Sequence, residues 1–221
     1  HHCDPTTCTI VFKPLSNNSF MRENHSGGLE IMQPEDSKDP DEEVKDPFHG
    51  EARLRILDIQ ERRPVGHEIQ CISEPSLYLL RARVSNIDGI SVGETIEISL
   101  ESIGSLSEVR LKDLSGTSQQ ELIPGLSSSI QADPERHISF YNSAGPMSLK
   151  FHSFQLLSGI GNSKAIQMVQ KRGIAGWQTF EDVDEACGIE SIRLLAERYV
   201  KEMEDVAQTP RLLDLLVRTE Q

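Results

Sequence analysis

The chain has 221 residues, a formal net charge of −13 and an ordinary share of hydrophobic residues, 37%. This length allows one large domain or two small ones, each with its own core. No run of about 18 apolar residues is present, and the first residues lack the basic stretch and apolar block of a secretory signal. We therefore expect a cytoplasmic protein without a membrane partner. Four scattered cysteines exclude a disulfide scaffold, and we expect neither a metal nor a cofactor.

Residues 1–50 are rich in Pro, Asp, Glu, Ser and Gly and show little hydrophobic periodicity. This composition predicts a mostly disordered, acidic N-terminal tail. Its block of acids, Asp36–Asp46, is typical of a solvated tail. The alternative is that the block competes with a nucleic acid for a basic face of the same chain.

Residues 51–115 change to short alternating runs that are separated by turn residues. The expected strands cover residues 52–59, 67–72, 76–84, 95–100 and 106–114. Five short strands in this length predict a small barrel of the OB type, although an SH3-like barrel has a similar pattern. Tyr78 is the only aromatic residue assigned to the barrel. Single-strand binding without sequence preference normally needs stacking rings, so the barrel is not favoured as a nucleic-acid platform.

Beyond Gly116 the apolar period becomes helical. Helices are expected over residues 119–131, 133–142 and 149–157. Pro124 is tolerated near a break or in a first turn, and Asp133 is followed by a proline at the first helical position. A turn, Ser158–Gly161, then separates the third helix from a fourth that starts at Asn162 or Ser163.

This turn has the composition of a phosphate-binding hairpin. Gly159 and Gly161 permit backbone angles that are closed to other residues and leave room for a phosphate, while Ile160 fixes the turn in the core. The first N–H groups of the following helix lack partners and carry the positive end of its dipole, so they can accept a backbone phosphate. Lys164 can add a charged contact. Such contacts read no bases, and an ordinary helical hairpin with a glycine turn is the alternative.

The charge distribution supports an anionic partner despite the acidic total. Residues 22–51 hold ten acids against three bases, whereas residues 136–180 hold five bases and no acid. A local basic face can attract a polyanion that the whole chain repels. The predicted nucleic-acid-binding residues are Ser158, Gly159, Ile160, Gly161, Asn162, Ser163, Lys164, Lys150, His152, Lys171 and Arg172.

A second copy of the hairpin follows at an offset of 29 residues. Gly188 and Glu190 take the places of the two glycines, and Arg193 takes the place of Lys164. Because Glu190 puts a carboxylate where a phosphate would lie, we interpret this hairpin as structural. We expect Trp177, between the copies, to be a core anchor.

Three segments carry a resemblance to a known family: Phe140–Ala144, His152–Gly161 and Phe180–Val183. The chain resembles archaeal proteins of uncharacterised function that are regarded as RNA-binding or nucleotide-binding, with weaker similarity from about residue 54 to 203. That family usually has Pro and Lys where this chain has Ser158 and Asn162. The resemblance implies an OB-like barrel before tandem helix-hairpin-helix motifs. It also implies a link to translation, with an RNA partner such as ribosomal RNA.

The expected fold class is therefore α+β with two domains. The parts are an OB-like barrel at 51–115, connecting helices at 116–145, a tandem helix-hairpin-helix domain at 146–205 and a C-terminal helix or tail at 206–221. The expected function is non-catalytic binding of RNA, or else DNA, at the first hairpin.

Two alternatives remain open. One is a protein–protein adaptor that contacts ribosomal or polymerase proteins. The other is a DNA-repair protein of the helix-hairpin-helix class, in which Asp182 or Asp184 would act downstream of the hairpin. No matching catalytic arrangement is visible, so an enzyme is not expected.

Overall fold

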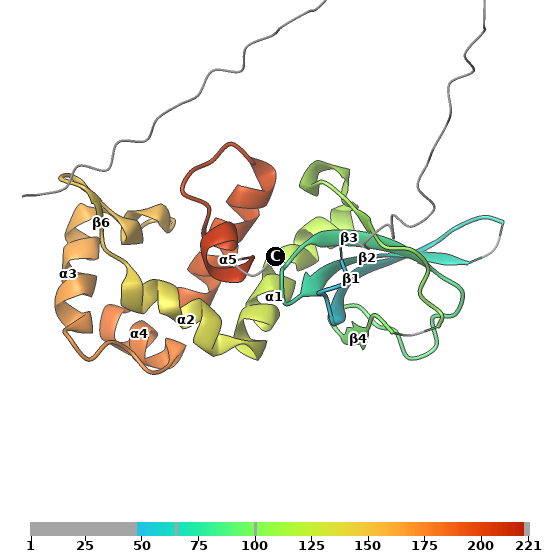
Figure 1. Cartoon of the computed structure of the whole chain (residues 1–221), viewed down its shortest axis with the longest axis horizontal. Coiled ribbons are helices and arrows are strands. Elements are labelled where there is room, and N and C mark those ends of the chain that lie inside the picture. The colour runs from blue at the N-terminus through green and yellow to red at the C-terminus, as the bar shows by residue number, and fades with distance from the viewer. Residues whose placement is uncertain (1–47, 65, 100, 219–221) are drawn as a thin grey trace, which may run out of the picture. The chain divides into compact units, whose positions relative to one another are not determined.

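The computed structural model describes residues 48–64, 66–99 and 101–218. An antiparallel sheet with the strand order β4-β1-β2-β3-β5 forms its first part (Figure 1). The strands are β1 (Arg53–Glu61), β2 (His67–Glu74), β3 (Leu79–Val84), β4 (Thr95–Glu97) and β5 (Ser107–Glu108). All five lie where the sequence predicts them, but the last three are shorter. β3 starts late because Leu77 adopts a positive φ of 57°, and residues 111–113 form the 3-10 helix η1 instead of extending β5.

A β-bulge in β1 connects the sheet to the helices. The register with β2 shifts between Ile56 and Asp58, so Leu57 is the extra residue. Neighbouring side chains of a strand point to opposite faces, so Ile56 belongs to the hydrophobic cluster inside the sheet and Leu57 to the cluster that the helices form. The extra residue keeps Asp58 on the helix side as well, where its carboxylate accepts a hydrogen bond from Ser115 Oγ at 2.6 Å.

Helix α1 (Gly116–Ala132) approaches the sheet most closely at Gly125. A Cβ on Gly125 would lie 3.0 Å from Leu57 Cδ2 and 3.2 Å from Ile72 Cδ1. Pro124 lies in the interior of this continuous helix, so its expected place near a break or first turn is wrong. Small residues at this point let the helix axis come close to the strands.

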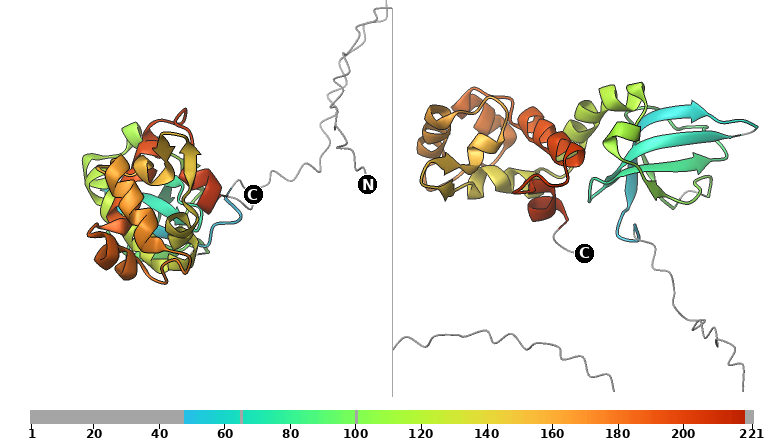
Figure 2. Two further views of the ribbon diagram at one scale, coloured as in Figure 1. Left: turned by 90° about the vertical axis from the view of Figure 1, so that its left-hand side faces the viewer. Right: turned by 90° about the horizontal axis from the view of Figure 1, so that it is seen from above.

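The cluster that the helices form also includes Leu57 and Ile72 of the sheet, and α1 contacts both β1 and α5 (Figure 2). The described residues, from 48 to 218, belong to one compact unit. The mixed α+β class is confirmed, but the division of this part into two domains is not. β1 and β2 turn apolar side chains toward α1, so part of the sheet packs together with the helices.

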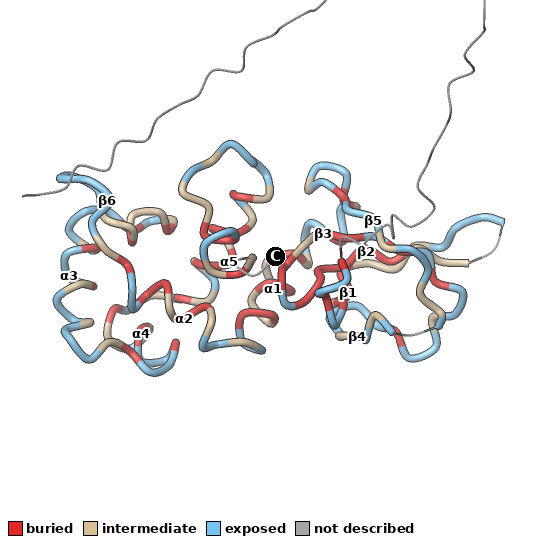
Figure 3. The backbone as a smooth tube through the Cα atoms, in the orientation of Figure 1, coloured by how far each residue is buried: buried red, intermediate tan, exposed pale blue. Residues whose placement is uncertain are grey.

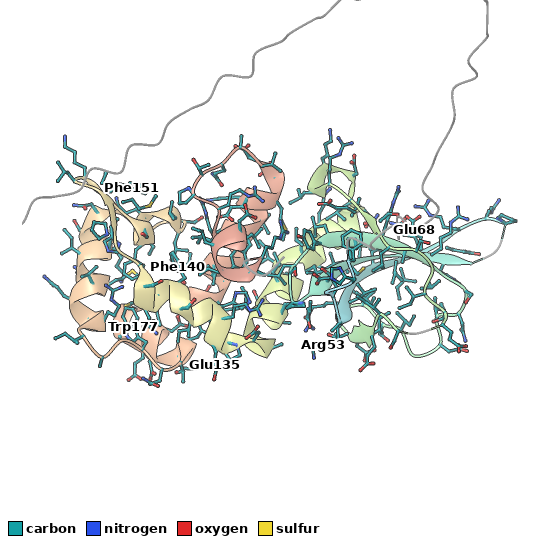
Figure 4. All side chains as sticks on the ribbon, in the orientation of Figure 1. Arg53, Glu68, Glu135, Phe140, Phe151 and Trp177 are labelled. Atoms are coloured by element: carbon teal, nitrogen blue, oxygen red, sulfur yellow. The ribbon has the colours of Figure 1, made fainter. Side chains whose placement is uncertain are left out.

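The remaining helices are α2 (Pro134–Ser143), α3 (Asn162–Arg172), α4 (Phe180–Cys187) and α5 (Ser191–Glu204). Aromatic rings join them, among them Phe140, Tyr141 and Phe154. Trp177 is buried beside Phe154, as predicted, and Figure 4 labels it together with Phe140.

The expected helix over residues 149–157 is wrong. This segment belongs to the hairpin of β6 (Pro146–Ser148) with β7 (Phe151–His152), followed by the 3-10 helix η2 (Ser153–Leu156). A capping box fixes the start of η2: Phe154 N–H donates to His152 Nδ1 at 3.2 Å, and His152 N–H donates to Gln155 Oε1 at 2.8 Å. These reciprocal bonds end the strand where the periodicity alone predicts a continuing helix.

The C-terminal segment folds back on α5 and ends in a single π-type turn, η3 (Leu213–Val217). The anchor is the buried carboxylate of Glu202, which accepts N–H bonds from Leu212 and Leu213, both at 2.9 Å. Arg198 pairs with the same carboxylate at 2.7 Å. The expected C-terminal helix is thus reduced to one turn.

Two aromatic residues lie at the sheet. Phe48 is buried and meets the Tyr78 ring edge-on, with centroids 5.8 Å apart. The interpretation of Tyr78 as the only barrel aromatic is therefore wrong, because Phe48 had been assigned to the tail. Arg218 covers the Tyr78 ring at 4.1 Å.

Residues 1–47, including the acidic block, lie outside the described part of the chain. Within that part, no helix is long and apolar enough to cross a membrane.

Candidate functional site

The predicted turn between η2 and α3 is present, but its two glycines have different roles. Gly159 has φ +74°, which strongly favours glycine, whereas Gly161 has φ −85° and ψ 175°, which any residue can adopt. The expectation that both need special backbone angles is wrong for Gly161. Ile160 between them is buried, as predicted. No atom lies within 4 Å of the place of a Cβ on either glycine, so the surface is open there.

The N-terminus of α3 is uncapped. Gly161 is the N-cap residue and provides no side-chain hydrogen bond, and the first turn contains no acid. Asn162 and Ser163 are exposed, consistent with the exposed outer side of α3 in Figure 3. By contrast, Ser115 caps α1 and Thr179 caps α4 through their side-chain oxygens. The first N–H groups of α3 are thus oriented toward the surface without a side-chain acceptor, and they carry the positive end of the helix dipole.

The second turn shows how a carboxylate occupies such a helix start. Gly188 takes the left-handed conformation with φ 61°, and α5 follows. Asp184 Oδ1 accepts the Ser191 N–H at 2.7 Å, so the helix start has an internal anion. Glu190, predicted to hold this place, pairs instead with Arg193 at 3.1 Å.

The offset of 29 residues makes the two turns directly comparable. The counterpart of Asp184 in the first copy is Gln155, whose oxygen accepts the His152 N–H and so takes part in the η2 cap. The counterpart of Ser191 is Asn162. Asp184 thus provides a carboxylate acceptor at the start of α5. At the start of α3 its counterpart, Gln155, is uncharged and binds the His152 N–H instead.

A groove of about 440 Å³ lies between the two turns. Its charged lining consists of Lys164, Arg193, Glu190 and Glu197. Arg193 pairs with both carboxylates, and the two cations and two carboxylates together make the lining formally neutral.

Lys201 contributes to the same turn, although no sequence motif indicates this. Its Nζ donates to Ser158 Oγ at 2.6 Å, across 43 positions of the chain. Lys201 is exposed in the last turn of α5, and only the tertiary fold brings it to the first hairpin.

Three predicted basic residues bind main-chain carbonyls at helix ends. Lys164 donates to Cys187 O and Lys171 to Ala186 O, both at the C-terminus of α4. Arg172 Nη1 donates to three carbonyl oxygens at the end of α2, the nearest being Ala144 O at 2.6 Å. Cations at these positions stabilise the negative ends of the helix dipoles. Most of the positive charge of the acid-free stretch is thus engaged inside the fold.

The remaining predicted site residues are separate from the turn. His152 is partly buried at the start of η2; burial, together with Arg172, lowers the pKa of its ring. Lys150 is exposed in the turn between β6 and β7.

Asp182 and Asp184, which the repair alternative would use, and the buried His137 all have structural partners. Asp182 completes the α4 cap by accepting the Thr179 N–H at 2.9 Å, and Asp184 caps α5. His137 is buried and is joined to Tyr199 Oη by a hydrogen bond of 2.9 Å. Burial lowers the pKa of His137 to about 4, although Asp133 acts in the opposite direction.

The fold and this site define an α+β protein in which an antiparallel sheet shares a core with a set of short helices and two related glycine turns. A family model described as "Protein of unknown function (DUF655)" matches residues 50–211, and the chain belongs to this family.

The relatives are archaeal, as the sequence resemblance predicted. The chain is 25% identical over 124 residues to "Uncharacterized protein MJ0038" of Methanocaldococcus jannaschii, which is 54% of this chain and 57% of that protein. It thus spans little more than half the length of this relative. The crystal structure of Af1531 from Archaeoglobus fulgidus, titled as a DUF655 family model, has a TM-score of 0.66 at 20% identity. The match covers 74% of this chain and 99% of that one, and it supports the fold alone.

Proposed function

We propose that this chain is a non-catalytic nucleic-acid-binding protein that holds a backbone phosphate at the N-terminus of α3. The observation that carries the proposal is the difference between two related helix starts. At α5 the carboxylate of Asp184 accepts the Ser191 N–H, while at α3 Gly161 provides no cap and the surface is open. A helix start of this kind binds anions, and a phosphate would complete at α3 what Asp184 completes at α5.

The proposal includes a finer description of the fold. The strand order and the bulge in β1 agree with an OB-like sheet. The turns at Gly159 and Gly188 agree with a tandem pair of hairpins, although the first arm of the first hairpin is the short 3-10 helix η2. Only the first turn is proposed to bind phosphate.

RNA is the proposed partner because of the resemblance described for the sequence. The contacts themselves involve phosphate oxygens and N–H groups, so they do not distinguish RNA from DNA. A role at the ribosome or in translation belongs to the same proposal. The absence of an enzymatic role is supported by the structural partners of Asp182, Asp184 and His137.

A protein–protein adaptor is the second candidate, and one observation favours it. The aromatic ring of Tyr78 packs against Phe48 and under the Arg218 guanidinium, so it is engaged within the fold. A sheet surface without stacking rings suits a protein partner as well as a phosphate backbone.

The test is binding of a structured RNA and a DNA duplex, followed by fluorescence anisotropy over a range of salt concentrations. Wild type is compared with Gly161→Glu, which places a carboxylate at the open helix start. The phosphate proposal expects weak binding, in the range of about 10⁻⁴–10⁻⁶ M for a single site, with a salt dependence that decreases in the variant. Equal affinity and equal salt dependence in the two proteins would refute the α3 site, and the lack of salt-dependent binding to either nucleic acid would favour the adaptor.

A further inference from the structure

A second concave surface lies at the sheet, where the β1–β2 hairpin, the end of β3 and the loop after β4 meet. Its volume is about 450 Å³. We call it the arginine cleft, after the three arginines in its lining: Arg62, Arg63 and Arg83. Glu101 is the only carboxylate residue that lines it within the described residues. A local excess of positive charge in a chain of net charge −13 is unusual enough to need a physical explanation.

Two of the three arginines have no internal acceptor. Arg62 pairs with Glu68 on β2 at 2.7 Å, and Figure 4 labels this glutamate. Arg63 and Arg83 are exposed and make no ion pair and no side-chain hydrogen bond among the described residues. By contrast, Lys164 and Arg172 donate hydrogen bonds to carbonyl oxygens at helix ends.

Arg83 lies at the edge of the cleft and is paired in register with Glu68 of β2, so these two side chains share one face of the sheet, while Val84 and His67 share the other. In β3 the alternating pattern buries Ala82 and Val84 and exposes the arginine between them. The loop after β4 closes the wall, because the Gly104 N–H donates to Arg83 O at 2.8 Å. A Cβ on Gly104 would lie 3.1 Å from that oxygen, so a residue without a side chain fits this close approach best.

His67 adds an unsatisfied polar group beside the cleft. His67 is among the residues that line the cleft, and its Nδ1 is buried without a hydrogen-bond partner in the described structure. A buried polar atom without a partner costs free energy and calls for a functional or structural reason.

We propose that the arginine cleft is a second anion site, which holds phosphate groups of the nucleic-acid strand that binds at α3. Guanidinium groups bind phosphate through two parallel N–H bonds, and the volume lies within the range of small-ligand sites. Apart from the His67 imidazole, the lining contains no aromatic ring, so phosphate rather than base stacking is the recognised chemistry. The identity of the strand rests on the proposed function, but the anion chemistry of the cleft does not.

The first test uses inorganic pyrophosphate and the ¹⁵N-labelled full chain. Saturable shifts of the Gly66, His67 and Gly104 amide signals are expected, and they should be lost in the double variant Arg63→Ala, Arg83→Ala. The control is Arg110→Ala with Lys112→Ala, which removes the same charge from two exposed positions outside the cleft. If the cleft amides do not shift, or if the control loses the shifts equally, the anion site is refuted.

The second test measures RNA affinity in the same proteins. The double variant should bind about tenfold or more weakly at low salt, with a salt slope smaller by about one to two, and the control should change less than about twofold. If Gly161→Glu weakens binding and the double variant does not, the cleft is refuted while the α3 site stands. If the reverse holds, the cleft stands and the α3 site fails. If a polyglutamate peptide binds the cleft more tightly than RNA, the natural partner is an acidic protein, and the strand proposal is wrong.

Discussion

Replacing Gly161 by Asp should change stability and binding in opposite directions. The φ of −85° and ψ of 175° at Gly161 are those of an N-cap residue, and nothing lies within 4 Å of a Cβ built there. An aspartate fits this place without strain and can accept an N–H from the first turn of α3. The new carboxylate would then occupy the place that we propose for a phosphate.

The two magnitudes follow from known energies. An aspartate cap in place of glycine, together with its favourable position at the helix dipole, should stabilise the fold by a few tenths to about 1 kcal/mol. A carboxylate about 4 Å from a phosphate costs about 1 kcal/mol in water and about 4 kcal/mol at an effective dielectric constant of 20. This corresponds to a loss of affinity between roughly fivefold and a thousandfold.

The assay pairs urea unfolding with RNA binding for Gly161→Asp, Gly161→Asn and Gly161→Ala. Asn supplies the cap without the charge and should bind with intermediate affinity, while Ala supplies neither and should bind like wild type at slightly lower stability. The reasoning is refuted if Asp stabilises the fold and leaves RNA affinity unchanged, because the helix start would then be an uncapped end without a ligand. The reasoning is also refuted if Gly161→Ala loses as much RNA affinity as Gly161→Asp, because the charge of the aspartate would then have no effect.

Three further predictions concern the rest of the molecule. Replacing Glu202 by Ala leaves Arg198 as a buried, unpaired charge and should lower the free energy of unfolding by about 3–5 kcal/mol in urea denaturation; a loss below 1 kcal/mol would contradict this. The buried His137 ring is neutral in the folded protein, and its pKa is lowered to about 4 from the usual 6.5. The stability that depends on the neutral ring is therefore fully present above pH 6.5. About 3 kcal/mol should be lost as pH falls toward 4, so His137→Gln should flatten the pH dependence, and parallel curves would argue against it. Deleting residues 1–44 keeps the buried Phe48 and should strengthen RNA binding severalfold at low salt if the acidic block competes, whereas unchanged affinity would make it a passive tail.

Much of the fold is readable from local pattern. Alternating runs locate all five strands, and the Asp133-Pro134 pair marks the start of α2, although the Asp133 side chain makes no cap hydrogen bond. The errors arise where non-local contacts decide. The bulge at Leu57 keeps Asp58 on the same side as Leu57, next to the start of α1, and no periodicity reveals an inserted residue of ordinary type. The need for glycine at position 125 depends on its close contact with Leu57, which is far away in the sequence.

The candidate site was predictable in its backbone and not in its charges. The Gly159 turn and the start of α3 follow from glycine chemistry and helix periodicity. The partners of Lys171 and Arg172 are carbonyls that lie 15 and 28 or more positions away, so sequence could not reveal that these cations are occupied. A stretch without acids is therefore not by itself a basic surface.

The cations that remain without an internal acceptor decide how strongly the chain can bind. One phosphate at α3 is a weak site, because Lys164 donates to a carbonyl and the groove beside it is nearly neutral. If the arginine cleft holds two further phosphates, three contacts act on one strand, and linked weak sites bind far more tightly than each alone. For a single strand the affinity should then fall with a slope of about −2 against the logarithm of the salt concentration. A measured slope near −0.7 would mean that only the α3 phosphate is bound. A slope near zero would mean that neither the α3 site nor the arginine cleft binds phosphate.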